Sequence, residues 1–266
     1  MKSFVLWKKK FLVLAGVGLL LLYFFSLPRN LFNDPYTTVV EDRHGQLLSA
    51  SIASDGQWRF PERDHVNEKF ARAITAFEDK RFWNHPGVDL LALGRALQQN
   101  IRAGRIVSGG STLTMQVIRL SRRNPPRTVI QKLIELSLST RAEIRYSKNE
   151  ILNLYSSHAP FGGNVVGIEA ACWRYFGRSS QELSWAEAAM LAVLPNNPSL
   201  IHLDRNRTRL LQKRNHLLRK LFLQGELDQL SYDLARSEPI PDRPQHFPGA
   251  PCQSECCLHT PELLLS

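Results

Sequence analysis

The sequence is poor in cysteine and lacks the short motifs that mark common nucleotide-binding and nucleic-acid-binding proteins. Four cysteines in 266 residues do not form a disulfide scaffold, and Cys172, in the segment EAACWRYF, is expected to be a buried thiol. The other three, in PCQSECC near the C-terminus, lack the paired histidine spacing of a zinc site. Because no GxxxxGK[ST] loop or other phosphate fingerprint is present, a soluble nucleotide sugar is not the expected substrate.

Acidic side chains are outnumbered by basic ones. Lys and Arg number 34 against 24 Asp and Glu, which gives a formal net charge of +10. An excess of this size favours an acidic partner, either nucleic acid, anionic lipid head groups or a phosphorylated substrate. Since no nucleic-acid-binding module is evident, lipid and phosphorylated substrates are the expected partners.

The N-terminus combines a basic segment with a long uncharged run. Residues 1–10, MKSFVLWKKK, carry four lysines, and the run 11–27 follows them. As a helix the run would be roughly 25 Å long, at the short end of a bilayer span. A cleaved signal peptide is the alternative, although no A-x-A pattern follows the run. Lysines before the run favour a cytoplasmic N-terminus, so we predict an uncleaved transmembrane anchor with the following residues outside the cytoplasm.

Patterning after residue 35 predicts a small β segment and then a helical domain. The turn signals DRHGQ and SDGQ, within alternating apolar and polar residues, predict a β-hairpin or meander over 36–60. Helical periodicity between Gly- and Pro-containing breakers predicts one mainly α domain over 61–240, and a proline-rich, exposed, irregular tail over 241–266. The expected helices are 67–83, 88–103, 111–121, 128–145, 148–157, 164–176, 184–193 and 204–223.

Two adjacent acidic residues, Glu78 and Asp79, stand near the end of the first expected helix, which HPG (85–87) would terminate. Glu78 lies beside the apolar stripe, so its carboxylate would be partly desolvated, with a raised pKa suited to accepting a proton. Asp79, about 100° further round, would hydrogen-bond or cap. The alternative is a surface Glu78 paired with Arg81 or Lys80. The stripe consists of Phe70, Ala73, Ile74 and Phe77.

The segment GGST (109–112) precedes an amphipathic helix pattern. Its two glycines allow the backbone to approach a ligand, and Ser111 is a suitable N-cap. Free N–H groups at a helix N-terminus, with two hydroxyls beside them, suit an anion such as phosphate. A plain capped turn is the alternative.

Three cations follow this segment at intervals, Arg119, Arg127 and Lys132, and Glu135 comes after them. Together they would extend an anion site. Lys132 and Glu135 could equally form an ordinary i,i+3 surface pair.

The sequence contains, in a fixed order, the segments EDKRFWNHPGVD, GGSTLTMQ, QKLIE, SKNEILNLY and GIEAACWRYFGR with LSWAEAAMLAVLPNNPS. Together they resemble the peptidoglycan glycosyltransferases of family 51, the transglycosylase half of class A penicillin-binding proteins. The resemblance covers about residues 36–248, and GRIVSGGSTLTMQVIRL and APFGG are most similar to the 1C type. It implies a mainly α, lysozyme-like fold with an amphipathic face at the membrane.

The resemblance also implies an activity, the polymerisation of lipid II into β-1,4 glycan with release of undecaprenyl pyrophosphate, on the periplasmic side of the bacterial inner membrane. Glu78 would be the general base that takes the proton of the attacking 4-hydroxyl, and Glu135 would assist at the leaving group or position the donor. Arg119, Arg127 and Lys132 would neutralise the diphosphate. Further substrate-binding positions implied by the resemblance are Asp79, Phe82, His85, Gly110, Ser111, Thr112 and Gln116.

Some positions depart from the family pattern. Met115 replaces a Gln, and Gln131 replaces an Arg, which removes one charge near the diphosphate. The pair Ser156-Ser157 stands where Leu-Asn is usual and affects packing at a helix end. A catalytically weak or inactive form that still binds lipid II or cell-wall synthesis partners is therefore the alternative function.

The SxxK and K[ST]G motifs of the transpeptidase are absent, so we expect no transpeptidase activity and a chain truncated before that domain. A lysozyme-type glycosidase is a third possibility, but cleaving a neutral glycan needs no basic diphosphate site. No cofactor is required by the resemblance, and assistance by Mg²⁺ or Mn²⁺ stays open because no ligand cluster is evident. The expected partners are lipid II, the growing glycan chain, inner-membrane lipids and other cell-wall synthesis proteins, without nucleic acid.

Overall fold

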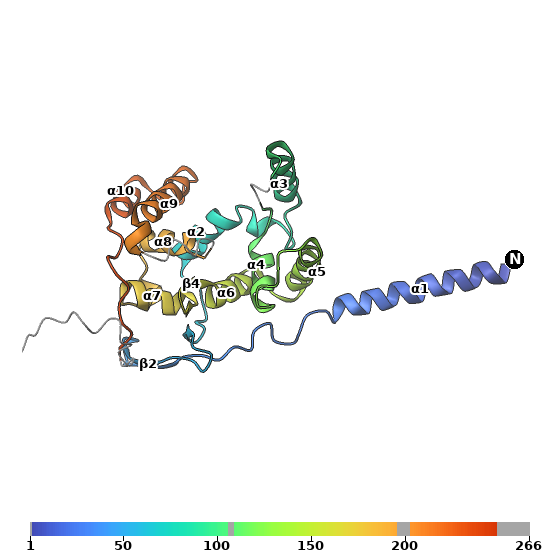
Figure 1. Ribbon diagram of the computed structural model, residues 1–266, viewed down its shortest axis with the longest axis horizontal. Helices are drawn as coiled ribbons and strands as arrows, with labels where there is room; N and C mark the ends of the chain where they lie inside the picture. The colour runs from blue at the N-terminus through green and yellow to red at the C-terminus, as the bar shows by residue number, and fades with distance from the viewer. Residues whose placement is uncertain (1, 106–108, 196–202, 249–266) are drawn as a thin grey trace, which may run out of the picture.

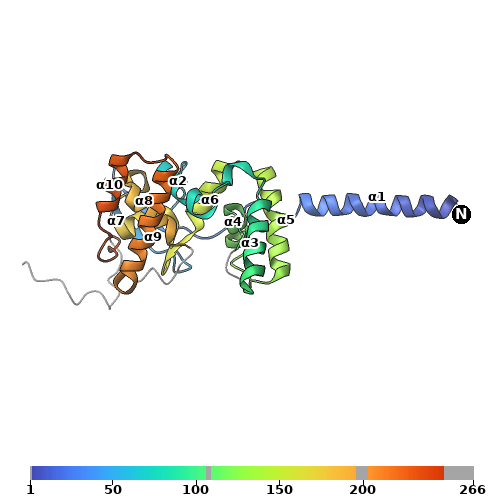
Figure 2. The ribbon, with the colours of Figure 1, turned by 90° about the horizontal axis from the view of Figure 1, so that it is seen from above.

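The computed structural model describes residues 2–105, 109–195 and 203–248. Helix α1 (Lys2–Phe24) projects from a helical body that contains the other elements (Figure 1). Within the body, α3, α4 and α5 are grouped at the end nearer α1, and α7 to α10 are grouped at the opposite end (Figure 2). Helices α2 and α6 lie between the two groups, so a residue at an end of α2 can contact both.

The predicted transmembrane anchor over 11–27 is not confirmed. Among the described residues, no helix combines the length and the apolar character needed to cross a membrane. α1 includes lysines of the basic segment and ends at Phe24, before the uncharged run does.

In the described residues, two small sheets accompany the helices. Thr38–Glu41 (β1) and Leu47–Ser51 (β2) pair antiparallel, joined by a turn in which Asp42 accepts hydrogen bonds from the backbone of His44 and Gln46. The second sheet has the order β3-β5-β4, with β3 (Trp58–Arg59) parallel to β5 (Val165–Val166) and β4 (Pro160–Gly162) antiparallel to it. Because β4 and β5 occupy 160–166, the helix predicted from residue 164 begins only at Ile168.

The remaining helices follow the predicted order with shifted ends. Most begin at a side chain that accepts a backbone N–H, as with Ser147 and Ser184, which each form a capping box. Helix α10 was not predicted from the sequence. The bounds are α2 Glu68–Glu78, α3 Leu90–Ala103, α4 Leu113–Ser121, α5 Val129–Arg145, α6 Lys148–His158, α7 Ile168–Phe176, α8 Trp185–Val193, α9 Leu203–Leu223 and α10 Gln229–Ser237, with 3-10 turns at Phe82–Asn84 and Ser180–Glu182.

The core surrounds α8, whose residues from Ala186 to Val193 are all buried. Helix α2 packs against α8 and α9. Its residues Phe70 and Ile74 are fully buried, as predicted, whereas Phe77 is only half-buried. The predicted burial of the Cys172 thiol is confirmed, while the other three cysteines lie outside the described residues. This packing makes α2 a rigid support for the residues at its C-terminal end.

The helix predicted over 67–83 is interrupted. α2 ends at Glu78 because Asp79 has non-helical backbone angles, φ −148° and ψ 75°, and Phe82–Asn84 forms a separate 3-10 turn. The HPG segment therefore lies beyond the helix end and does not cause it. In contrast, α6 continues without a break through Ser156 and Ser157, and the Ser156 hydroxyl donates to the Leu152 carbonyl at 2.5 Å.

The segment after α10 packs on the body, although 241–266 was expected to be an exposed tail. Phe247 is 4% exposed, and its ring centroid lies 4.3 Å from that of Trp58. Ala50 of β2 donates its backbone N–H to the Pro248 carbonyl at 2.9 Å. We call residues 239–248 the C-terminal strap, because they contact β2, Trp58 of β3 and Arg174 of helix α7.

Candidate active site

Glu78 is the last residue of α2, and its carboxylate is half-buried. Gln116 of α4 donates its side-chain N–H to Glu78 Oε2 at 2.9 Å. The Arg81 guanidinium, one of the two surface partners considered for Glu78, forms a two-pronged ion pair with Asp89, with Nε 2.8 Å from Oδ2. Asp89 also caps α3. Glu78 is therefore a carboxylate at the end of α2 that accepts a hydrogen bond from α4.

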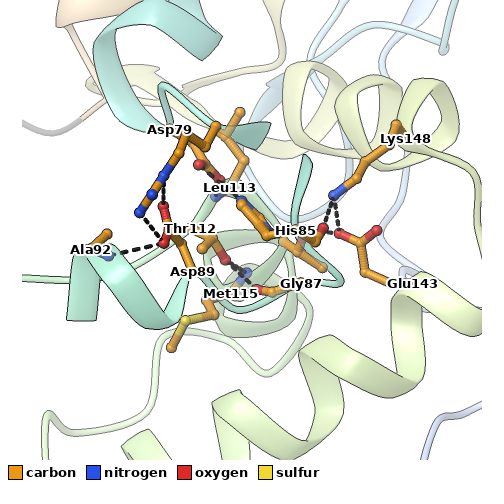
Figure 3. Close-up of polar contacts among 12 residues, drawn as sticks. Asp79, His85, Gly87, Asp89, Ala92, Thr112, Leu113, Met115, Glu143 and Lys148 are labelled. Atoms are coloured by element: carbon orange, nitrogen blue, oxygen red, sulfur yellow. Dashed lines mark hydrogen bonds and ion pairs between the residues drawn. The ribbon is translucent and has the colours of Figure 1, made fainter. Parts of the chain in front are cut away.

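The neighbouring Asp79 is buried at 5% exposure and ties three segments together (Figure 3). Its carboxylate oxygens lie 2.9 and 3.0 Å from His85 Nε2, and Oδ2 accepts the backbone N–H of Leu113 at 3.0 Å. The predicted hydrogen-bonding role of Asp79 is thus confirmed. It fixes the start of α4, and with it Gln116, relative to the end of α2.

The hydroxyls of GGST are used differently from the prediction. Thr112, not Ser111, is the N-cap of α4: its Oγ1 accepts the Met115 N–H at 3.2 Å and donates to the Gly87 carbonyl at 2.5 Å. The Ser111 hydroxyl instead accepts a hydrogen bond from Lys132 Nζ at 2.6 Å. Ser111 therefore does not cap α4, and its hydroxyl contacts a cation of α5 instead.

A buried carboxylate and two cations form the second half of the site. Glu135 is 1% exposed; Arg119 Nε lies 2.8 Å from its Oε1, and Lys132 Nζ lies 3.4 Å from its Oε2. The alternative of a surface pair between Lys132 and Glu135 is therefore wrong. Burial lowers the pKa of Lys132, an effect that the negative charge of Glu135 opposes.

The other residues predicted for this region contribute less directly. Arg127 is exposed before α5, and within the described residues its side chain makes no hydrogen bond or ion pair. The Gln131 side-chain oxygen is buried without a hydrogen-bond partner in the described part of the chain. Gly110 approaches protein rather than open space, since a Cβ there would lie 2.8 Å from Leu93 Cα.

Two lysines and a tyrosine near Glu78 were not predicted from the sequence. Burial lowers the pKa of Lys213 and of Lys220 on α9, an effect that the negative charge of Glu78 opposes in part. Lys220 Nζ also donates to the Ala76 carbonyl in the last turn of α2. Burial, followed by the charge of Glu78, raises the pKa of the Tyr155 phenol well above its ordinary value. The spacing of the two lysines by two helical turns was the signal that could have placed them on one face of α9.

Lys148, another residue that was not predicted, contacts the HPG segment. Its ammonium donates to the His85 carbonyl at 2.6 Å, pairs with Glu143 at 2.8 Å and lies 4.5 Å from the centroid of the Phe82 ring. Phe82 is fully buried. Two residues predicted to bind substrate, Phe82 and His85, are thus buried and contact other parts of the domain. Three others lie beside the two carboxylates: Ser111, Gln116 and Arg119.

No group of three or more His, Cys, Asp or Glu side chains in the described ranges could hold a metal ion. The electrostatic character of the site comes instead from lysine and arginine placed around two acids. α4 connects the two halves, because Gln116 contacts Glu78 and Arg119, three residues further along the same helix, contacts Glu135.

A sequence model described as "Transglycosylase" matches residues 44–222. The chain belongs to the transglycosylase family. The matched range includes both carboxylates, the capped start of α4 and the lysines of α9.

Characterised proteins with similar sequences include penicillin-binding proteins. Penicillin-binding protein 1C of Escherichia coli is 41% identical over 225 residues, 84% of this chain and 29% of that protein. Penicillin-binding protein 1A of Aquifex aeolicus is 35% identical over 206 residues, 77% of this chain and 28% of that protein. A crystal structure of penicillin-binding protein 1A from Haemophilus influenzae has a TM-score of 0.44 at 20% identity, covering 81% of this chain and 22% of that one. The chain therefore spans less than a third of the length of these relatives.

Proposed function

We propose that this chain is a peptidoglycan glycosyltransferase that polymerises lipid II into β-1,4 glycan and releases undecaprenyl pyrophosphate. The observation that carries the proposal is the double use of α4, which holds Glu78 through Gln116 and Glu135 through Arg119. Side chains three residues apart on a helix lie about 5–6 Å apart at Cβ. A proton acceptor and a cationic anion site are therefore brought within the reach of one substrate.

In the proposed reaction, the 4-hydroxyl oxygen of the lipid II GlcNAc attacks the anomeric carbon of the terminal MurNAc of the growing chain. Glu78 takes the hydroxyl proton as the new C–O bond forms. The bond from the anomeric carbon to the diphosphate breaks, and its electron pair leaves with undecaprenyl pyrophosphate. Arg119 and Lys132, with Arg127, would stabilise the charge that develops on the diphosphate, and Glu135 would keep the first two in position. A single displacement inverts the α-linked donor to a β product.

We further propose that the reaction takes place at the periplasmic face of the bacterial cytoplasmic membrane, since both substrates carry a lipid. Large apolar side chains exposed on two helices support contact with lipid. They are Leu90, Leu91, Leu97 and Ile101 of α3, and Val129, Ile130, Leu133 and Ile144 of α5.

The second candidate is a form that binds lipid II without polymerising it, and Gln131 favours it. This residue replaces a cation beside Lys132 and leaves a buried oxygen unpartnered in the described part of the chain, which weakens an anion site. The integrity of α6 through Ser156 supports the active enzyme instead.

The test is polymerisation of labelled lipid II by the purified protein, its Glu78→Gln variant and a matched Glu182→Gln variant. Both variants replace a Glu by Gln, but Glu182 is exposed and lies in the 3-10 turn Ser180–Glu182. We expect Glu78→Gln to lower the rate by about 10²- to 10⁴-fold, the usual contribution of a general base, and Glu182→Gln to leave it unchanged. The proposal includes no required metal ion, so chelation with EDTA should not abolish the product.

Three other results would lead elsewhere. Retained binding of lipid II without product, in folded wild-type protein, would favour the binding form. Equal rates for wild type and Glu78→Gln would remove Glu78 from the reaction. Release of free sugar ends from finished peptidoglycan would instead indicate a hydrolase.

A further inference from the structure

A cavity of about 770 Å³ lies beside α2, on a different set of side chains from those around the two carboxylates. Its walls come from the start of the domain, from α2, from Trp83 after the buried Phe82, and from α6. None of the described residues that line it is Glu78, Gln116, Glu135 or a cation assigned to the diphosphate. The volume is within the range of small-ligand sites, roughly 300–1,000 Å³.

Trp83 gives this cavity an aromatic platform. The residue is 53% exposed, which is unusual for so large an apolar ring. Its ring meets the fully buried Phe82 edge-on, with centroids 5.1 Å apart. The indole is thus anchored on one side and open on the other, an arrangement that suits stacking on a flat ligand with an apolar face.

Polar groups line the same cavity as Trp83. Asn149 and Asn153 are four residues apart on α6, so their side chains share one face of the helix. In the described part of the chain neither carboxamide makes a hydrogen bond, and the carboxylate of Asp64 makes none either. Free amide and carboxylate groups beside an aromatic ring can donate to and accept from hydroxyl groups.

The charge of the cavity argues against an anionic ligand. Its lining includes Asp64, Glu68, Glu150 and Glu226, and its one arginine among the described residues, Arg72, is already paired with Glu68 and Glu226. A diphosphate would be repelled here, whereas a neutral molecule rich in hydroxyls would not.

We propose that this cavity binds the neutral sugar units of a glycan strand, with Trp83 stacked on a sugar ring and Asn149, Asn153 and Asp64 hydrogen-bonded to its hydroxyl and N-acetyl groups. The inference rests on the proposed function, since such a strand would be its product. Because Thr75, one turn before Glu78 on α2, also lines the cavity, a strand held here stays close to the site where it is extended.

The probe for this site is chitotetraose, an uncharged tetramer of N-acetylglucosamine, titrated by calorimetry into the Glu78→Gln protein. We expect Trp83→Ala to weaken binding by about tenfold or more, the loss of one stacked ring with its buried area. Trp83→Phe, which keeps a ring, should retain most of the affinity. Asn153→Ala should also weaken binding, whereas Gln116→Ala, at the carboxylate site, should not.

Two results would overturn the inference: no binding of the tetramer at millimolar concentration, or equal affinity with and without the Trp83 ring. Thermal unfolding of each variant shows whether it is folded. The outcome for the proposed function is read separately, from lipid II polymerisation. Protein that binds chitotetraose through Trp83 but makes no glycan would refute the polymerase and retain the saccharide site; the converse result would refute the site alone.

Discussion

Asp79 accepts a hydrogen bond from the backbone N–H of Leu113, 34 residues further along the chain, at 3.0 Å. The contact joins the residue after α2 to the first residue of α4. Glu78 precedes Asp79, and Gln116 lies one turn after Leu113, so the same contact sets the spacing between the predicted general base and its hydrogen-bond donor.

Replacing Asp79 should therefore affect both folding and catalysis. Asp79→Ala leaves the Leu113 N–H and His85 Nε2 without their buried acceptor, and we expect a loss of about 3–5 kcal/mol in the free energy of unfolding. Urea denaturation measures it. The matched control is Asp228→Ala, which removes an exposed N-cap of α10 and should cost clearly less. Equal losses in the two variants would refute the structural role of Asp79.

The two hydroxyls of GGST should separate in a pair of variants. Thr112→Ala removes the N-cap and the bond to Gly87, so we expect about 2 kcal/mol of destabilisation, largely restored in Thr112→Ser. Ser111→Ala should leave stability nearly unchanged but raise KM for the donor, because Lys132 loses the partner that directs it. Thermal unfolding and steady-state kinetics check both. A larger stability loss for Ser111→Ala than for Thr112→Ala would contradict the assignment of the cap.

Gly87 should be intolerant of any side chain. Its φ is +85°, and a Cβ would lie 2.6 Å from the Ser139 carbonyl oxygen. Gly45 has a similar φ of +77° but open space around it. We expect Gly45→Ala to cost about 1–2 kcal/mol, the penalty of the left-handed conformation, and Gly87→Ala to cost clearly more, because backbone must move. Denaturation midpoints that coincide would show that the close approach is unimportant.

The pH profile should report Lys132. Burial lowers its pKa from 10.5, so its charge is lost at a lower pH than that of a solvated lysine. Activity that depends on this cation falls as pH rises through the lowered pKa. Stability changes the other way: the unfolded chain binds more protons between the lowered pKa and 10.5, so this group's contribution to the free energy of unfolding rises with pH across that window.

The variant Lys132→Arg keeps the positive charge at all accessible pH values. We expect the alkaline decline of kcat/KM, measured from pH 7 to about 11, to move to higher pH in this variant. An unchanged alkaline limb would assign the decline to another group.

The sequence predicted most of the helices, because these depend on local periodicity, while the roles of Glu78 and Glu135 stay predictions from the resemblance. The predicted end of the first helix and the predicted N-cap of α4 were wrong for the same reason. Asp79 leaves the helix where Leu113 and His85 engage its carboxylate, and Ser111 loses the capping role where Lys132 engages its hydroxyl. Such contacts join residues far apart in the sequence, and no local pattern encodes them.

The burial of individual side chains was also hard to predict from the local sequence. Lys132 and Glu135 have the spacing of an ordinary exposed pair, yet Glu135 is covered once α4 packs against α5 and brings Arg119 to it. Phe247 stands in a proline-rich segment typical of an exposed tail, but the ring of Trp58 gives it an apolar surface to cover.

The C-terminal strap has a consequence for biosynthesis. A ribosome delivers β2 and Trp58 roughly 190 residues before Phe247 and Pro248, the residues that cover and pair with them. At the usual rate of translation, about 5–20 residues per second, these early segments wait on the order of ten seconds or more for their partners. During that interval the nascent chain exposes an incomplete sheet and an uncovered aromatic surface, and both favour aggregation or capture by a chaperone.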